Sequence, residues 1–110
     1  MLVNNAAITP RQRQETPEGI ELQFATNVLG YFWLTRAFAE QLKAGSPSRV
    51  ANVASYWAGD LDLDDLEFRK RPYNNDTSYR QSKQAGYRKN KRYIHLKLKV
   101  PNCHSHPSFN

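Results

Sequence analysis

The fold is decided by residues 24–42, which read FATNVLGYFWLTRAFAEQL. Side chains at spacings of three and four along this stretch share one face of a helix; they are Phe24, Val28, Tyr31, Thr35, Phe38 and Leu42. Thr16 is placed to cap this helix and Pro17 suits its first position, whereas Gly45 is placed to end it. We therefore predict one long helix over residues 17–44.

Two short apolar segments flank this helix in the sequence. Val50 to Ala54 is an apolar run broken only by Asn52, which is typical of a parallel strand buried on both faces. Leu2-Val3 resembles the end of a strand, and because strands usually have about five or six residues, we expect this one to be cut at its front. A second helix is predicted over 79–86, with Thr77 or Ser78 as its cap. The order strand, helix, strand, helix predicts an α/β fold.

The rest of the chain is polar. Residues 56–76 form a long acidic and then basic loop, and a loop of this length is usually functional or disordered. Residues 88–92 are charged on every face and do not suit a packed helix. Residues 94–100 alternate between apolar and polar side chains, which predicts an exposed strand.

The net charge of +6 belongs to the end of the chain. All ten acidic residues and ten of the 16 basic residues lie within 1–86, which is therefore neutral. We divide the chain into 1–86 and a basic, divergent tail of residues 87–110. The tail could bind nucleic acid or an acidic membrane, but it carries no nucleic-acid motif, so a solvated or disordered segment is the favoured interpretation. Its basic residues are Arg88, Lys89, Lys91, Arg92, Lys97 and Lys99.

Several classes of protein are excluded by composition. A single cysteine, Cys103, cannot form an intramolecular disulfide, and with His104 and His106 it is too small a set for a metal site, so we expect none. No apolar run approaches the roughly 20 residues of a membrane span, and the N-terminus lacks the pattern of a signal peptide. The default expectation is a reduced, soluble compartment such as the cytoplasm.

The chemistry is concentrated in Tyr79-Arg80-Gln81-Ser82-Lys83. On a helix the side chains at i and i+4 share a face, so Tyr79 and Lys83 would lie together. An ammonium group beside a phenol stabilises the phenolate, which makes the two side chains a sensible acid/base pair. Taken alone this spacing is a weak signal, because surface helices carry such pairs by accident.

Three further features make the signal specific. Asn4-Asn5-Ala6-Ala7 ends the first strand, Asn27 lies inside the long helix, and Ser55 closes the second strand. With Tyr79 and Lys83 in this order, the chain resembles the short-chain dehydrogenase/reductase family. Ser55 and Tyr79 are 24 positions apart, and in this spacing the chain resembles the retinol-dehydrogenase-like branch, which includes relatives of WW-domain oxidoreductase.

The resemblance implies a fold and a set of roles. The fold would be part of a Rossmann-type parallel sheet with flanking helices, a fragment of a three-layer sandwich without its N-terminal strands. Tyr79 would be the general acid or base, Lys83 would assist it and hold the nicotinamide ribose, Ser55 would bind the substrate oxygen, and Asn27 would hold a water. The segment that borders the adenosine side of NAD or NADP would be Asn4, Asn5, Ala6 and Ala7, where Ala7 replaces the usual glycine.

The resemblance also implies what these 110 residues do not carry. The family holds the pyrophosphate on a glycine-rich loop, yet no two of the five glycines here lie within ten positions of each other. We therefore expect an NAD(P)-dependent oxidoreductase of hydrophobic alcohols or carbonyl compounds by descent, with little or no activity in this chain alone. Two alternatives remain open: a non-enzymatic fragment that pairs with a full-length relative, and a nucleic-acid binder that acts through the basic tail.

Overall fold

The computed structural model describes residues 1–86 and the backbone of 95–96. A three-stranded sheet is formed by β1 (Leu2–Asn4), β2 (Val50–Asn52) and β3 (His95–Leu96), in the order β1-β2-β3. β1 and β2 are parallel, with Leu2 opposite Val50 and Asn4 opposite Asn52, whereas β3 is antiparallel to β2. The sheet is therefore an α/β arrangement with one parallel pair, as the sequence predicts.

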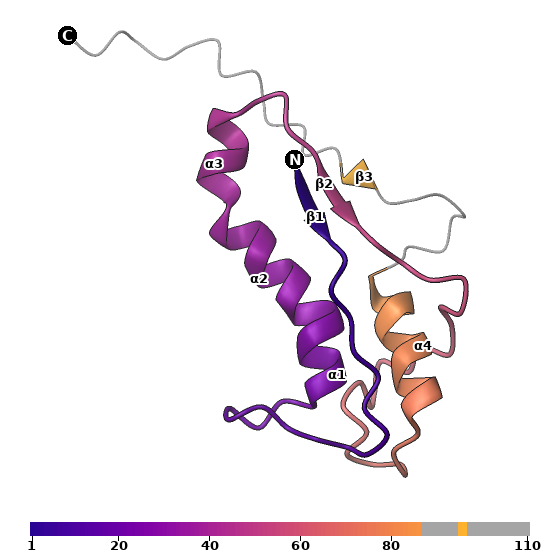
Figure 1. The fold of residues 1–110 in the computed structure, drawn as a ribbon. Helices are drawn as coiled ribbons and strands as arrows, with labels where there is room; N and C mark the ends of the chain where they lie inside the picture. The colour runs from indigo at the N-terminus through magenta and orange to yellow at the C-terminus, as the bar shows by residue number, and fades with distance from the viewer. Residues whose placement is uncertain (87–94, 97–110) are drawn as a thin grey trace, which may run out of the picture.

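The long helix of the sequence is a chain of four shorter elements (Figure 1). These are α1 (Leu22–Phe24), the π-helical η1 (Ala25–Leu29), α2 (Gly30–Ala37) and α3 (Ala39–Ala44). Gly45 follows α3 as its C-cap, as predicted. The helical stretch runs alongside β1, and the side chain of Thr35 on α2 contacts Asn4 at the end of that strand.

The predicted start of this helix at residue 17 is wrong. Thr16 and Gly19 form a tight turn in which the amide of Gly19 donates to the Thr16 carbonyl over 2.9 Å, and Gly19 has a φ of 81° that suits glycine. Pro17 fits the second position of such a turn as well as it fits a helix start. The cap is Glu21, whose carboxylate accepts from the amides of Gln23 and Phe24.

The second predicted helix is longer than expected. α4 spans Asn75–Ala85, and its cap is Asn74, whose side-chain oxygen accepts from the amide of Thr77 over 3.0 Å. The predicted caps, Thr77 and Ser78, are wrong because both lie inside the helix. α4 packs against α1 and η1 near the lower end of the molecule in Figure 1.

The segment between β2 and α4 is irregular but held in place. The predicted strand over 50–54 ends at Asn52; the amide of Val53 still donates to the Asn4 carbonyl over 2.8 Å, and the residues after it lie outside any strand. Asp65 is buried and accepts hydrogen bonds from the amides of Arg69, Lys70 and Arg71. The predicted long loop is therefore a folded connection.

The sheet has one covered and one open face within the described residues. Asn4 and Val50 are 2% exposed, whereas Val3 is 51% exposed and Val53 is 39% exposed. Adjacent residues of a strand point to opposite faces, so Asn4 faces the helices and Val3 faces away from them. The described residues thus form part of the layered fold. Of the predicted strand over 94–100 only His95–Leu96 is described, and the remainder of the tail lies outside the described residues.

Candidate active site

The site is built around Asn27, which lies in the π-helical turn η1. Its side-chain oxygen accepts from the amide of Ile8 over 2.9 Å, and its side-chain nitrogen donates to the Ile8 carbonyl over 3.0 Å and to Ser82 Oγ over 3.0 Å. Asn27 is 2% exposed, so these bonds form away from water. The hydrogen bonds of Asn27 join the segment after β1 to α4. The π-helical turn that carries Asn27 is of a kind that is frequent at functional sites.

Tyr79 and Lys83 share one face of α4. Lys83 Nζ lies 5.8 Å from the centroid of the Tyr79 ring, within the range of a cation–π contact. Tyr79 is half-buried, and its carbonyl accepts a hydrogen bond from Ser82 Oγ over 2.7 Å. The helix therefore presents a phenol at a partly accessible position with a cation one turn behind it.

The ammonium group of Lys83 is almost fully buried. Lys83 is 4% exposed, and its Nζ donates to the Val53 carbonyl over 3.1 Å and to the Tyr31 hydroxyl over 3.4 Å. Burial lowers the pKa of Lys83 because a buried site disfavours the charged form. Among the described residues no carboxylate forms an ion pair with Lys83.

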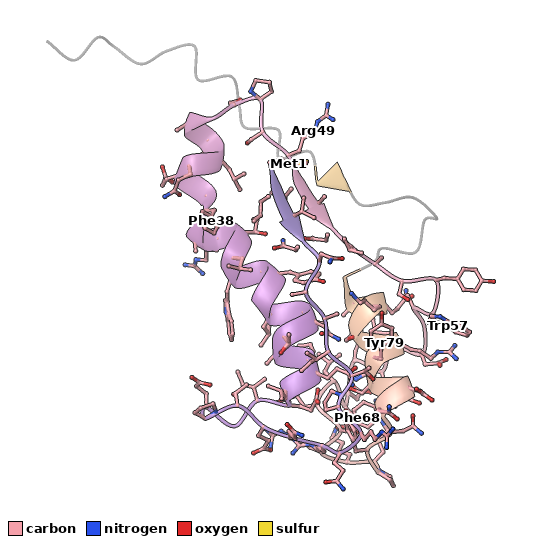
Figure 2. The ribbon with its side chains drawn as sticks, in the orientation of Figure 1. Met1, Phe38, Arg49, Trp57, Phe68 and Tyr79 are labelled. Carbon is pink, nitrogen blue, oxygen red and sulfur yellow. The ribbon has the colours of Figure 1, made fainter. Side chains whose placement is uncertain are left out.

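Ser55 lies after β2 and is half-buried. Ser55 Oγ accepts from the amide of Trp57 over 3.1 Å, and no hydrogen bond within the described part of the chain joins it to Tyr79. Trp57 and Tyr79 line one pocket of about 380 Å³ together with Thr9, Asp76 and Arg80. Figure 2 shows Trp57 on the side of the molecule that carries Tyr79. A ligand in this pocket would lie against one tyrosine, one tryptophan and three polar residues.

The segment after β1 is divided between interior and surface. Asn4 is buried, and its side-chain nitrogen donates to Thr35 Oγ1 over 3.2 Å and to Asn52 Oδ1 over 2.7 Å, while its Oδ1 is buried without a partner. Asn5, Ala6 and Ala7 are exposed. The Asn4 side chain therefore ties β1 to β2 and α2, whereas the next three residues are accessible to a ligand.

Two side chains that the sequence analysis did not assign to the site belong to its structure. Ser82 bonds both to Asn27 and to the carbonyl of Tyr79, and it lies next to Lys83. Tyr31 contacts Lys83 from α2. The sequence analysis placed Tyr31 on the core face of the helix; its position four residues after Asn27 is the available signal that both side chains face α4.

The hydrogen-bond donors of this site suit the nicotinamide ribose of NAD or NADP better than the pyrophosphate. Two of the three N–H groups of Lys83 donate to Val53 and Tyr31, and the third has no protein acceptor among the described residues. Gly19 is the only glycine among the described residues with a positive φ, and it lies in the turn that starts at Thr16, not between a strand and a helix. No glycine-rich phosphate cradle is present among them.

Other ligand chemistry is not indicated by the described residues. They contain no group of three metal-ligating His, Cys, Asp or Glu side chains, and Cys103, His104 and His106 lie outside them. No helix in the described part of the chain is long and apolar enough to span a membrane.

The parallel strands, the asparagine in the adjacent helix and the Tyr-x-x-x-Lys pair define an α/β protein that carries the sequence pattern compared above with short-chain dehydrogenases. The family model described as short chain dehydrogenase matches residues 1–62. The chain belongs to the short-chain dehydrogenase family, in its retinol-dehydrogenase-like part.

Curated relatives are similar to the chain over its first three quarters. Human retinol dehydrogenase 13 is 42% identical over 87 residues, which cover 77% of this chain and 26% of the relative. Human retinol dehydrogenase 14 is 40% identical over 87 residues, which again cover 77% of this chain and 26% of the relative. Zebrafish polyprenol dehydrogenase is 37% identical over 91 residues, which cover 77% of this chain and 28% of that relative. The chain thus spans about a quarter of the length of the relatives it matches. No solved structure matches it significantly.

Proposed function

We propose that this chain carries the acid/base part of an NAD(P)-dependent oxidoreductase that acts on a hydrophobic alcohol or carbonyl compound. The observation that supports the proposal most strongly is the buried Lys83 ammonium group, 5.8 Å from the Tyr79 ring on the same face of α4. A lysine is almost never buried without a partner of opposite charge unless the site uses its charge.

The roles of the residues follow from their chemistry. Tyr79 gives a proton to the substrate oxygen on reduction or takes it on oxidation, and Lys83 stabilises the phenolate form during that step. Ser55 binds the substrate oxygen, and Asn27 fixes the separation of α4 from the segment after β1. NAD or NADP supplies or accepts the hydride when bound; Lys83 and the exposed Asn5, Ala6 and Ala7 are the residues proposed to meet it.

The proposed substrate class is a long apolar alcohol or aldehyde such as a retinoid. Two kinds of relative are named for isoprenoid alcohols, retinol and polyprenol, and the pocket beside Tyr79 has the indole of Trp57 as an apolar wall. In this chain alone we propose little or no turnover, because a hydride donor held only at its nicotinamide end is not positioned for reaction.

A chimera tests the acid/base assignment. The matching segment of human retinol dehydrogenase 13 is replaced by residues 1–86 of this chain, and retinal reduction is measured. The chimera should be active, and Tyr79→Phe should lower kcat by about 10²-fold or more, since the phenol hydrogen is the proton that is transferred. Tyr56→Phe, at a side chain that is 96% exposed, is the control and should change little.

Two outcomes would contradict the proposal. One is a Tyr79→Phe chimera as active as its parent. The other is an inactive parent chimera that still folds and binds NADPH. The 110-residue chain, measured in parallel, should show neither micromolar NADH or NADPH binding by fluorescence nor oxidation of a test alcohol.

A second candidate function is supported by the exposed apolar side chains of α2 and its C-cap. Phe32, Trp33, Leu34 and Phe38 are between 45% and 58% exposed, and large exposed apolar patches mark interaction surfaces. We propose as the alternative that the chain pairs with a full-length short-chain dehydrogenase without catalysing a reaction itself. The nucleic-acid alternative depends on the basic tail, which lies outside the described residues.

A further inference from the structure

We infer that Tyr31 is a positioning residue for Lys83: its hydroxyl accepts a hydrogen bond from the buried ammonium group and, with the Val53 carbonyl, fixes that group beside the Tyr79 ring. The inference rests on the proposed function, because it assigns Tyr31 a part in the Tyr79–Lys83 pair. Nothing in the Tyr-x-x-x-Lys spacing itself points to a third side chain on another helix.

The geometry leaves Lys83 few other arrangements. Its Nζ lies 3.4 Å from the Tyr31 hydroxyl oxygen, 3.1 Å from the Val53 carbonyl oxygen, and 5.6 Å and 5.8 Å from the ring centroids of Tyr31 and Tyr79. The ammonium group is thus held from three elements: α2, the residue after β2, and α4 itself. Tyr31 is 9% exposed, so water does not readily replace its hydroxyl.

The protonation states agree with this role. Burial, and to a smaller extent the neighbouring Tyr79, raise the pKa of Tyr31, so its hydroxyl stays neutral and can accept the hydrogen bond. The titratable groups that face Lys83 are Tyr31 from α2 and Tyr79 from α4; from the β2 side it meets an uncharged carbonyl. A neutral acceptor is therefore the main side-chain support for the cation within the described residues.

The role differs from simple packing in what it does to Lys83. A hydrogen bond to the ammonium group stabilises its charged form, whereas ring packing alone would be retained when the hydroxyl is removed. Tyr31→Phe deletes one oxygen atom and keeps the ring, so it separates the two contributions.

The test is an NMR titration of the Lys83 side chain in the 110-residue chain. Tyr31→Phe should lower the pKa of Lys83 by roughly 0.5–1 unit relative to the parent, the size expected for one lost hydrogen bond to a charged group. Tyr73→Phe is the matched control, because the Tyr73 hydroxyl also bonds within the protein, to Gln23 and Pro10, but does not contact Lys83. An unchanged or raised pKa in Tyr31→Phe, or an equal fall in Tyr73→Phe, would overturn the inference.

A reciprocal variant keeps the test decisive if Tyr31→Phe does not fold. Lys83→Met removes the cation and should raise the pKa of Tyr31 further, because the phenolate loses an attractive charge. No change in Tyr31 in that variant would also overturn the inference. These titrations measure pKa values and do not depend on enzymatic activity. The proposed function is tested by Tyr79→Phe in the chimera, so a failure of the inference can be distinguished from a failure of the proposed function.

Discussion

Asp65 is the single residue on which the connection between β2 and α4 depends most. Its carboxylate accepts from the amides of Arg69, Lys70 and Arg71 and from Arg71 Nε over 3.2 Å, and it is 6% exposed. Arg71 in turn donates to the Gln81 side chain on α4 over 2.9 Å. A carboxylate with this many donors organises the connection that also carries Trp57, which lines the pocket beside Tyr79.

We predict that the stability contributed by Asp65 is lost in acid. Burial acts to raise the pKa of Asp65, but the amides of Arg69, Lys70 and Arg71 and the Arg71 guanidinium together hold it below its usual value. A lowered folded-state pKa means that the contribution is present above the unfolded value of about 3.9 and is lost as the pH falls through the folded one.

Asp65→Asn should therefore lower the melting temperature at pH 7. Between pH 5 and pH 2 the melting temperature of the variant should fall less than that of the parent. Thermal unfolding followed by circular dichroism measures both. Asp64→Asn, at an exposed neighbouring carboxylate, is the control. A variant that keeps the full acid dependence of the parent would show that Asp65 is not its source.

At the scale of elements, the first helical stretch begins where a buried glutamate can cap it. Glu21 is fully buried, and its carboxylate accepts hydrogen bonds from the amides of Gln23 and Phe24. The amide of Glu21 donates to Glu67 Oε1 over 3.0 Å. The cap thereby connects α1 to the loop that precedes α4. Thr16 is used instead in the preceding turn, where its hydroxyl accepts from the amide of Ile20.

Removal of this cap should destabilise the protein. Glu21→Ala leaves two helix amides without their acceptor, so we expect a loss of about 1–2 kcal/mol in the free energy of unfolding, measured by urea denaturation. Glu18→Ala is the comparison, because Glu18 would be the more important residue if the helix began at residue 17. A larger loss in Glu18→Ala than in Glu21→Ala would contradict the observed helix start.

At the scale of the whole molecule, α2 and its C-cap carry an exposed apolar surface. Phe32, Trp33, Leu34 and Phe38 are exposed on α2 and its C-cap, next to the charged Arg36, and Val3 and Val53 are exposed at the strands. Figure 1 shows α2 and α3 along one edge of the molecule, with α4 at the other end. A second polypeptide could cover the α2 side without blocking Tyr79.

Trp33→Gln should therefore weaken pairing with a full-length relative. We expect the dissociation constant with human retinol dehydrogenase 13 to rise roughly fivefold or more, since a buried aromatic residue at an interface commonly contributes over 1 kcal/mol. Sedimentation velocity of the mixed proteins is the measurement. Tyr56→Gln is the control, because Tyr56 is also an exposed aromatic residue but lies beyond β2. Equal affinities for the parent chain and Trp33→Gln would exclude α2 as the surface.

The sequence predicts the parts of this protein that depend on local pattern. The apolar face of 24–42, the short strands and the i, i+4 spacing of Tyr79 and Lys83 are set by periods of about 3.6 and 2, which can be read directly from neighbouring residues. The element order and the family follow from them and are confirmed by the sheet and the relatives. The assigned roles of Asn27, Ser55, Tyr79 and Lys83 stay predictions.

Element ends and partners depend on contacts that a local pattern does not contain. Glu21 rather than Thr16 caps α1 because residues 16–19 form a turn and the loop at Glu67 meets Glu21. Asn74 rather than Ser78 caps α4, because Ser78 is buried within the helix at 2% exposure. For α1 a long-range contact selects one of several residues with similar capping ability, whereas Asn74 caps α4 through a local bond from the amide of Thr77.

The sequence alone determined the strand–helix–strand–helix order, the Tyr79–Lys83 pair and the neutrality of residues 1–86, because composition and spacing are properties of the chain itself. Only the tertiary structure decided that Asn27 bridges Ile8 and Ser82, and that Tyr31 meets Lys83. These contacts join residues 19, 55 and 52 positions apart. They exist because packing of α4 against the first helical stretch buries polar groups, and most buried polar groups in proteins are hydrogen-bonded.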